Sequence, residues 1–173
     1  MKTLLSMLFL VFLSGNLSFG QSKEQIRHEL DSIYLSNISK SRINGVYIPK
    51  DMDDAFVQLD KLSTDEARAK YKATSEEIVA KKLHFGLGRW MSYNWNFDEG
   101  SRFSHLLRKM GIANTDDMID FMLISYHRHL NAVDQGYGDR IKIYQEKAKK
   151  AREEELKKGE VIHTEVRPIP KKD

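Results

Sequence analysis

The side chains best suited to chemistry lie in one aromatic stretch and the loop that follows it. Residues 83–95 hold both tryptophans, two glycines spaced i,i+2 and His84. The next loop places Phe97 beside two carboxylates, Asp98 and Glu99. Aromatic side chains with arginine are the composition of interaction hot spots, and paired carboxylates across a cleft suit glycoside hydrolysis. This region is therefore the candidate site.

We expect a contact surface around the loop at Trp95 and Phe97, because exposed aromatics next to arginine favour binding. The candidate binding residues are Trp95, Phe97, Arg102, Arg89, Tyr93, Asn94 and His84. A second interpretation is a small hydrolase of envelope glycans or peptides that uses Asp98, Glu99 or His84, with Trp95 as a sugar platform. A third is a structural envelope protein in which Trp95 and Phe97 are core residues. The pattern assigns no catalytic residue.

A metal site would require three or four ligands that converge in space. His127 and His129 are two residues apart and point to different faces of a helix, so they form no local pair. His84, His127 and Asp120 would converge only if two helices crossed with their polar arcs facing each other. Separate histidines are the simpler interpretation, and we predict no metal and no cofactor.

Composition narrows the classes of function further. The chain has 28 Lys or Arg against 25 Asp or Glu and a formal net charge of +3. This net charge is too small to produce the strong positive field that attracts nucleic acid. It has no cysteine, so an exported fold would depend on packing rather than on disulfides. It also lacks a G-x-S-x-G elbow. Gly86-x-Gly88 lies within a predicted helix, which does not suit a phosphate-binding loop.

The N-terminal segment, residues 1–20, has the layout of a secretory signal peptide. Lys2 precedes an apolar run over residues 4–13, and the small residue Gly20 precedes Gln21. The run is short for a membrane span, which needs about 20 apolar residues. We expect cleavage near Gly20–Gln21, no transmembrane span in the mature chain, and a periplasmic or secreted protein. A retained anchor is the alternative.

Apolar residues with helical spacing predict a mostly all-α fold, a compact orthogonal bundle of about five to six helices. A capping box at Ser22 starts a leader helix over about residues 23–39. An extended connector follows, and a charged helix lies at the C-terminal end. The expected division is a signal peptide (1–20), a leader helix and connector (21–44), a helical domain (45–150) and a charged helix end with a flexible tail (151–173).

Two helices, over about residues 76–92 and 116–131, should form the centre of the domain. In the first, Gly86 falls on the apolar line, where another backbone or ring would approach closely. Gly88 lies on the opposite side, for close packing or, alternatively, as part of a ligand contact. The second helix is apolar nearly all round, which is typical of a central helix. Ser125 and His129 on its apolar line should be buried and hydrogen-bonded.

Several short motifs resemble an uncharacterised family of small bacterial proteins that carry a helical domain of unknown function. They are Leu-His-Phe-Gly-Leu-Gly-x-Trp at 83–90, Asn94-Trp95, Gly100-Ser101-Arg102, Asp116-Asp117-Met118 and Ser-Tyr-His-Arg-x-Leu-Asn at 125–131. The resemblance covers about residues 45–144. It departs at Asn96-Phe97, where a glycine and a second tryptophan would be expected. The resemblance implies a compact helical domain and no assigned activity.

Together these patterns predict an exported, non-catalytic binding or interaction module. Its expected partner is a protein or another component of the cell envelope, and not nucleic acid. The hydrolase and the structural protein remain the alternatives.

Overall fold

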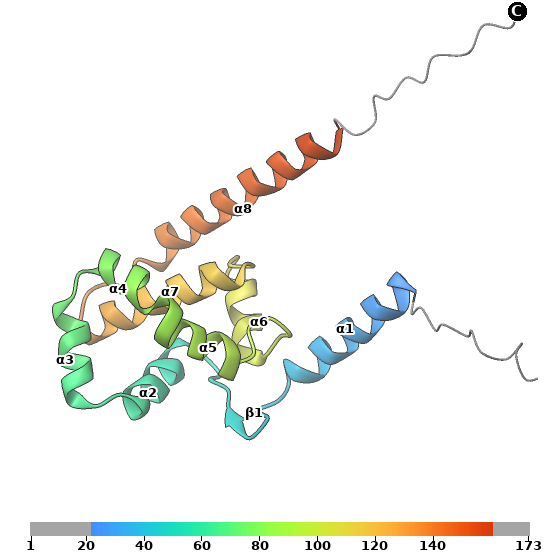
Figure 1. Ribbon diagram of the computed structural model, residues 1–173. Coiled ribbons are helices and arrows are strands. Elements are labelled where there is room, and N and C mark those ends of the chain that lie inside the picture. Colours follow the sequence, from blue (N-terminus) through green and yellow to red (C-terminus); the bar gives the residue numbers. More distant parts are fainter. Residues whose placement is uncertain (1–21, 161–173) are drawn as a thin grey trace, which may run out of the picture. The chain divides into compact units, whose positions relative to one another are not determined.

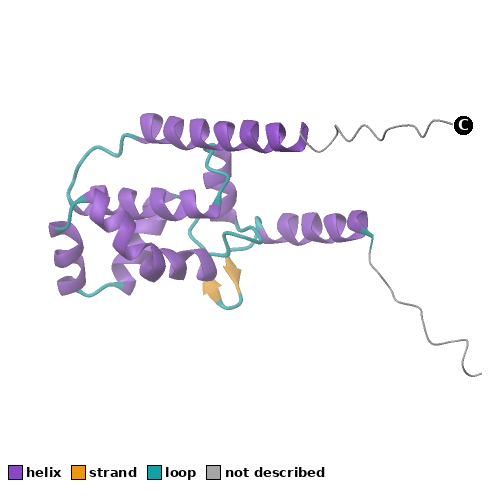
Figure 2. Cartoon of the chain, turned by 45° about the horizontal axis from the view of Figure 1, so that its top comes forward, coloured by secondary structure: helices purple, strands orange, loops and turns teal. Residues whose placement is uncertain are grey.

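Helices account for nearly all regular structure in residues 22–160, which the computed structural model describes (Figures 1 and 2). The predicted signal peptide, and residues 161–173 of the predicted tail, lie outside these residues. The elements are α1 (Lys23–Asn37), β1 (Arg42–Ile43), β2 (Val46–Tyr47), α2 (Met52–Leu62), α3 (Asp65–Ala73), α4 (Glu76–Leu83), η1 (His84–Gly88), α5 (Arg89–Asn94), α6 (Arg102–Lys109), α7 (Thr115–Leu130) and α8 (Tyr137–Glu160). The mostly α-helical fold is confirmed.

Packing divides the chain between Ser32 and Ile33. Apart from the Ser22–Gln25 cap of α1, the contacts described below lie on the C-terminal side of that boundary. Among residues 22–160, no helix combines the length and the apolar character needed to cross a membrane.

Polar side chains cap the starts of several helices, including the leader helix whose capping box the sequence predicts. At α1 the Ser22 backbone N–H donates to Gln25 Oε1 at 3.0 Å, and the Gln25 N–H donates to Ser22 Oγ at 3.2 Å. Ser101 caps α6 through the N–H of Ser104. Asn114 caps α7 by accepting from its first-turn amides. These side chains satisfy amides that have no partner inside the helix.

The connector before α2 contains a β-hairpin, which the sequence analysis missed. β1 pairs antiparallel with β2, and Ile43 lies opposite Val46. Asn44 (φ 50°) and Gly45 (φ 80°) form the tight turn between them. An Asn-Gly pair readily adopts positive φ at both central positions, which matches the twist of a two-residue hairpin. The connector that was expected to be extended thus contains a short antiparallel pair of strands.

A π-helical segment, η1, interrupts the helix predicted over residues 76–92. It places one extra residue between α4 and α5, and such insertions are frequent at functional sites. The insertion changes which glycine is buried. Gly86 is exposed, and a Cβ added there would meet nothing within 4 Å. Gly88 is buried, and a Cβ there would lie 2.4 Å from Ile119 Cγ2 of α7. The prediction that Gly86 is the close-packed glycine is therefore wrong.

α7 supplies much of the core, as its nearly continuous apolar circumference predicts. Met118, Phe121 and Met122 are fully buried. Ser125 is also buried, and its Oγ donates to the Phe121 carbonyl at 2.6 Å, which confirms its prediction. The matching prediction for His129 is wrong. His129 lies in the last turn of α7, where one face of its ring stacks on Phe56 at 4.5 Å while the residue stays exposed.

α8 is tied to α7 by a buried arginine. Arg140 is 8% exposed and donates to Phe121 O at 2.7 Å and to Ser125 Oγ at 3.1 Å. Its guanidinium also lies 4.5 Å from the centre of the Phe121 ring. Burial lowers the pKa of Arg140 from its usual value. One turn further on than Ile143, Lys147 Nζ donates to the buried Asp117 at 2.5 Å, so α8 follows α7 at least this far.

Glu76 at the start of α4 and Arg128 of α7 form a two-pronged ion pair. Arg128 Nε lies 2.6 Å from Glu76 Oε1, and Nη2 lies 3.0 Å from Oε2. The Arg128 hydrogen bond lowers the pKa of Glu76 against the opposing effect of partial burial. A carboxylate with a lowered folded-state pKa contributes stability above its unfolded pKa and loses it as pH falls through the folded pKa.

We therefore expect Glu76→Gln to lower the free energy of unfolding by about 1–2 kcal/mol at pH 7. The deficit relative to wild type should shrink as the pH is lowered and Glu76 is protonated. Urea titrations from pH 7 to pH 3 would measure this. Glu77→Gln is the matched control, because its partner Lys81 is exposed and surface pairs contribute little. A deficit that stays constant across this pH range would contradict the assignment.

Candidate functional site

Two of the predicted contact residues belong to the core. Trp95 is 1% exposed and Phe97 is 0% exposed, so the prediction that these two form an exposed surface is wrong. Their rings pack with Phe103, with the Trp95 and Phe103 centroids 5.4 Å apart in an edge-on arrangement. The loop folds back because the Phe97 N–H donates to Ser92 O at 2.9 Å. Arg108 Nη2 then caps the Phe97 carbonyl at 2.9 Å.

Arg102 has a structural position rather than a free one. Its Nε donates to the Ile48 carbonyl at 2.9 Å, and Nη2 reaches the same oxygen. The guanidinium also lies 5.1 Å from the centre of the Tyr47 ring. Arg102 thus links the start of α6 to the end of the hairpin through its Nε and Nη2 donors.

The exposed aromatic side chains of this region lie in η1 and α5, before the loop that holds Trp95 and Phe97. Phe85 of η1 is 76% exposed and Tyr93 of α5 is 85% exposed. Arg89 lies midway between them and is also exposed. Residues spaced by four share a helical face. Within residues 22–160, the Arg89 side chain makes no hydrogen bond or ion pair. We call Phe85, Arg89 and Tyr93 the aromatic–arginine face.

A polar hollow of about 490 Å³ adjoins this face. Phe85 and Arg89 contribute to its lining together with His84. His84 Nδ1 lies 2.9 Å from Asp120 Oδ1, and its Nε2 lies 3.5 Å from Asp116 Oδ1. The two carboxylates are one turn apart on α7. They hold the imidazole from both sides, which fixes its orientation at the edge of the hollow.

A second hollow of about 470 Å³ lies beside the first. Tyr93, Asn94 and Glu99 contribute to its lining, and Ser92 and Asp98 line both hollows. Ser92 of α5 and Asp98 of the following loop therefore form a common boundary of the two hollows.

Two of the polar side chains around these hollows are partly engaged. Asp98 Oδ1 accepts from Thr115 Oγ1 at 2.6 Å, and Asn94 Nδ2 donates to Trp90 O at 2.9 Å. Four predicted binding residues, His84, Arg89, Tyr93 and Asn94, thus come together at the paired hollows, whereas Trp95, Phe97 and Arg102 do not.

The three-residue metal hypothesis is not supported by the packing. His84 and Asp120 do meet, but His127 Nε2 lies 2.6 Å from the Thr74 carbonyl, on another part of α7. Over the described residues 22–160, no group of three or more His, Asp or Glu side chains could hold a metal ion.

Sequence reasoning missed Phe85, Thr115 and Asp116. Phe85 adjoins His84 in the sequence, and their rings lie edge-on at 5.1 Å, so the pair was visible as a motif. Its exposure was not, because it depends on the register change at η1. Thr115 and Asp116 stand at the start of α7, where a polar side chain or a carboxylate is already explained by helix capping and the helix dipole.

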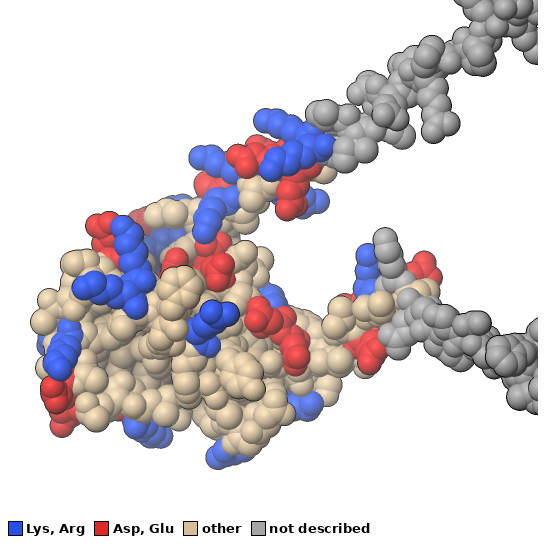
Figure 3. All heavy atoms as spheres, viewed as in Figure 1, with Lys and Arg blue, Asp and Glu red and all other residues tan. Residues whose placement is uncertain are grey.

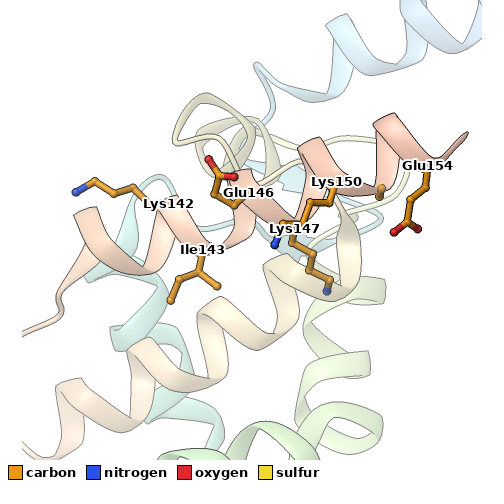
Figure 4. A pocket seen from close by; sticks show the side chains of 7 residues that line it. Lys142, Ile143, Glu146, Lys147, Lys150 and Glu154 are labelled. Carbon is orange, nitrogen blue, oxygen red and sulfur yellow. The ribbon is translucent and has the colours of Figure 1, made fainter. Parts of the chain in front are cut away.

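A third hollow, of about 650 Å³, follows one face of α8 (Figure 4). All of its lining comes from that helix: Lys142, Ile143, Glu146, Lys147, Lys150, Ala151 and Glu154. Lysine and glutamate alternate at helical spacing here, which is typical of a solvated face. On the face shown in Figure 3, positive and negative side chains are likewise interspersed.

A family model described as Domain of unknown function (DUF6794) matches residues 48–130. The matched segment runs from the end of the hairpin to the last residue of α7, so it contains His84 and the aromatic–arginine face. No curated protein and no solved structure matches the chain.

Proposed function

We propose that the protein is an exported binding module that contacts a protein or another envelope component through the aromatic–arginine face and its paired hollows. The observation that carries this proposal is the exposure of Phe85 and Tyr93 on either side of Arg89. Burying an aromatic or large aliphatic side chain gains about 1.5–3 kcal/mol. A partner that covered both rings would therefore gain substantially from contact here.

Arg89 would add geometric specificity to this apolar contact. Its guanidinium has no partner within the described chain, and a carboxylate on a partner would satisfy it in two-pronged geometry. Aromatic and arginine side chains at the centre of an interface are typical of hot spots. The adjoining hollows, with His84 and Asp98 in their linings, would receive the partner's polar side chains.

Export is part of the proposal and depends on the signal-peptide pattern of residues 1–20. Cleavage before Gln21 would leave the aromatic–arginine face in the periplasm or outside the cell, where an envelope component is accessible.

A small envelope hydrolase is the second candidate, because His84 and Asp98 line the same hollow. Two features favour binding over this alternative. Both imidazole nitrogens of His84 lie near carboxylates rather than near a hydroxyl nucleophile. Asp98 and Glu99 are exposed and lack the apolar surroundings that adapt a carboxyl group for acid catalysis.

We expect a Phe85→Ser/Tyr93→Ser double variant to lose envelope partners that the wild-type chain retains. The experiment is capture from a fractionated native envelope with the full chain, followed by mass spectrometry of the retained proteins and glycans. Val57→Ser on α2, another exposed apolar position, is the matched control and should retain the wild-type partners. All three proteins should melt alike, because the altered side chains are exposed.

Identical retained partners for the wild-type chain and the double variant would overturn the proposed surface. Turnover of envelope glycan or peptide by the wild-type protein, lost in His84→Gln or Asp98→Asn but retained in the double variant, would favour the hydrolase.

A further inference from the structure

An apolar groove lies away from the aromatic–arginine face, and the proposed function does not use it. It has a volume of about 500 Å³ and is lined from α3, α4, η1, the end of α2 and Tyr126 of α7. Ligand pockets in proteins commonly have volumes of about 300–1,000 Å³ and mainly apolar linings with a few placed polar groups. The groove fits that description.

The floor of the groove is apolar because its tyrosine hydroxyls are used elsewhere. Tyr71 OH donates to the Leu123 carbonyl at 2.9 Å, and Tyr126 OH donates to Asp60 Oδ1 at 2.8 Å. Val79 completes the buried floor. What these residues present to the groove is therefore ring and methyl surface.

The walls leave apolar surface in water. Leu62 and Ile78 both line the groove, and both are exposed. Covering this exposed apolar surface with an apolar ligand is favourable, because it removes the surface from water. Leu83 and Leu87 lie along the same groove and extend this surface from α4 into η1.

The charged side chains of the lining all carry the same sign. Arg68, Lys70 and Lys82 are present, without any Asp or Glu. Arg68 donates to the Asp60 and Ser63 carbonyls and forms an ion pair with Asp65 outside the lining. Lys70 forms an exposed pair with Glu66 at 2.8 Å. Lys82 makes no hydrogen bond or ion pair with any of residues 22–160. An anionic head group beside an apolar chain would complement this arrangement.

We propose that this groove binds a single long-chain carboxylate, such as a free fatty acid, with its hydrocarbon chain along the apolar floor and its carboxylate at Lys82. The chemical class follows from three observations: an apolar floor, exposed apolar walls and cations without lining carboxylates.

The test is isothermal titration of the full chain with dodecanoate, dodecanol and hexanoate. Dodecanoate should bind saturably with one molecule per chain. Hexanoate should bind at least tenfold more weakly, because each methylene buried contributes up to about fourfold in affinity. Dodecanol should bind several-fold more weakly than dodecanoate, because it lacks the charge that Lys82 would pair.

Two variants locate the site, each with a control on the same or a neighbouring helix. Ala67→Trp should fill the groove and weaken dodecanoate binding at least tenfold, whereas Ala69→Trp, an exposed α3 position outside the lining, should not. Lys82→Glu should weaken it several-fold, whereas Lys72→Glu should not. Thermal melting of each variant verifies that it is folded.

Three results would overturn the proposal. They are the absence of saturable dodecanoate binding by the wild-type chain, equal binding by folded Ala67→Trp, and dodecanol binding as tightly as dodecanoate. Self-association that Ala67→Trp abolishes, without fatty-acid binding, would assign the groove to a second copy of the chain instead.

Discussion

Replacing Trp95 with alanine is expected to lower the free energy of unfolding by about 3–5 kcal/mol, the usual cost of removing a buried aromatic side chain. Trp95 is almost completely buried. Its ring meets Trp90 at 6.0 Å and Phe103 at 5.4 Å, both edge-on. The substitution would remove a ring that two other aromatics contact and would leave a cavity that these rigid neighbours cannot fill.

Urea titration of the purified variant measures this change directly, with a lower midpoint at an unchanged slope. Tyr93→Ala is the matched control, because it removes an aromatic from the same segment at an exposed position. It should shift stability by no more than about 0.5 kcal/mol. Wild-type stability in Trp95→Ala would contradict the buried position of the ring. A loss of binding in Trp95→Ala would therefore not identify a contact surface, because the fold itself would be weakened.

Replacing each of the two glycines of η1 with alanine should change the stability of the protein in opposite directions. Gly88→Ala is expected to lower the free energy of unfolding by about 1–3 kcal/mol, the usual cost of an extra group in a packed core. The new Cβ would lie 2.4 Å from Ile119 Cγ2 and 3.3 Å from the Leu83 carbonyl oxygen. Ile119 is buried and β-branched, so it has little freedom to rotate away within its helix.

Gly86→Ala is the control and should raise stability by about 0.5–1 kcal/mol. A Cβ there meets nothing within 4 Å, and alanine favours helical backbone over glycine by about that amount. Parallel urea titrations of the two variants test the pair. A stabilising Gly88→Ala together with a destabilising Gly86→Ala would restore the sequence-based assignment and remove the π-helical register.

The sequence predicts the elements well because the signals for them are local. Capping residues such as Ser22, Ser101 and Asn114 act within one turn of the helix they start. The apolar circumference of α7 likewise identifies a central helix without reference to its neighbours. Such features can be recognised in the sequence without any knowledge of tertiary contacts.

The candidate site was only partly predictable because its geometry depends on contacts between elements. Trp95 and Phe97 lie on irregular backbone, and only the fold decides whether such side chains cover the core or face solvent. The π-helical insertion leaves no mark in the spacing of apolar residues, so the exposure of Phe85 and of Gly86 could not be foreseen, whereas the close packing at Gly88 was one of the two interpretations of that position. The hairpin, by contrast, could have been predicted, because Asn44-Gly45 is a local sequence signal for a two-residue turn.

The extra residue in η1 has a consequence for changes in chain length. Gly86 touches little, and η1 holds one residue more than a continuous α-helix would need over the same span. Deleting Gly86 would therefore let the segment close into regular α-helix, with Met91 still buried and Tyr93 still exposed. Inserting one further residue would instead turn α5 by about 100° relative to α4, since an α-helix has 3.6 residues per turn. This segment should therefore tolerate the loss of a residue better than the gain of one.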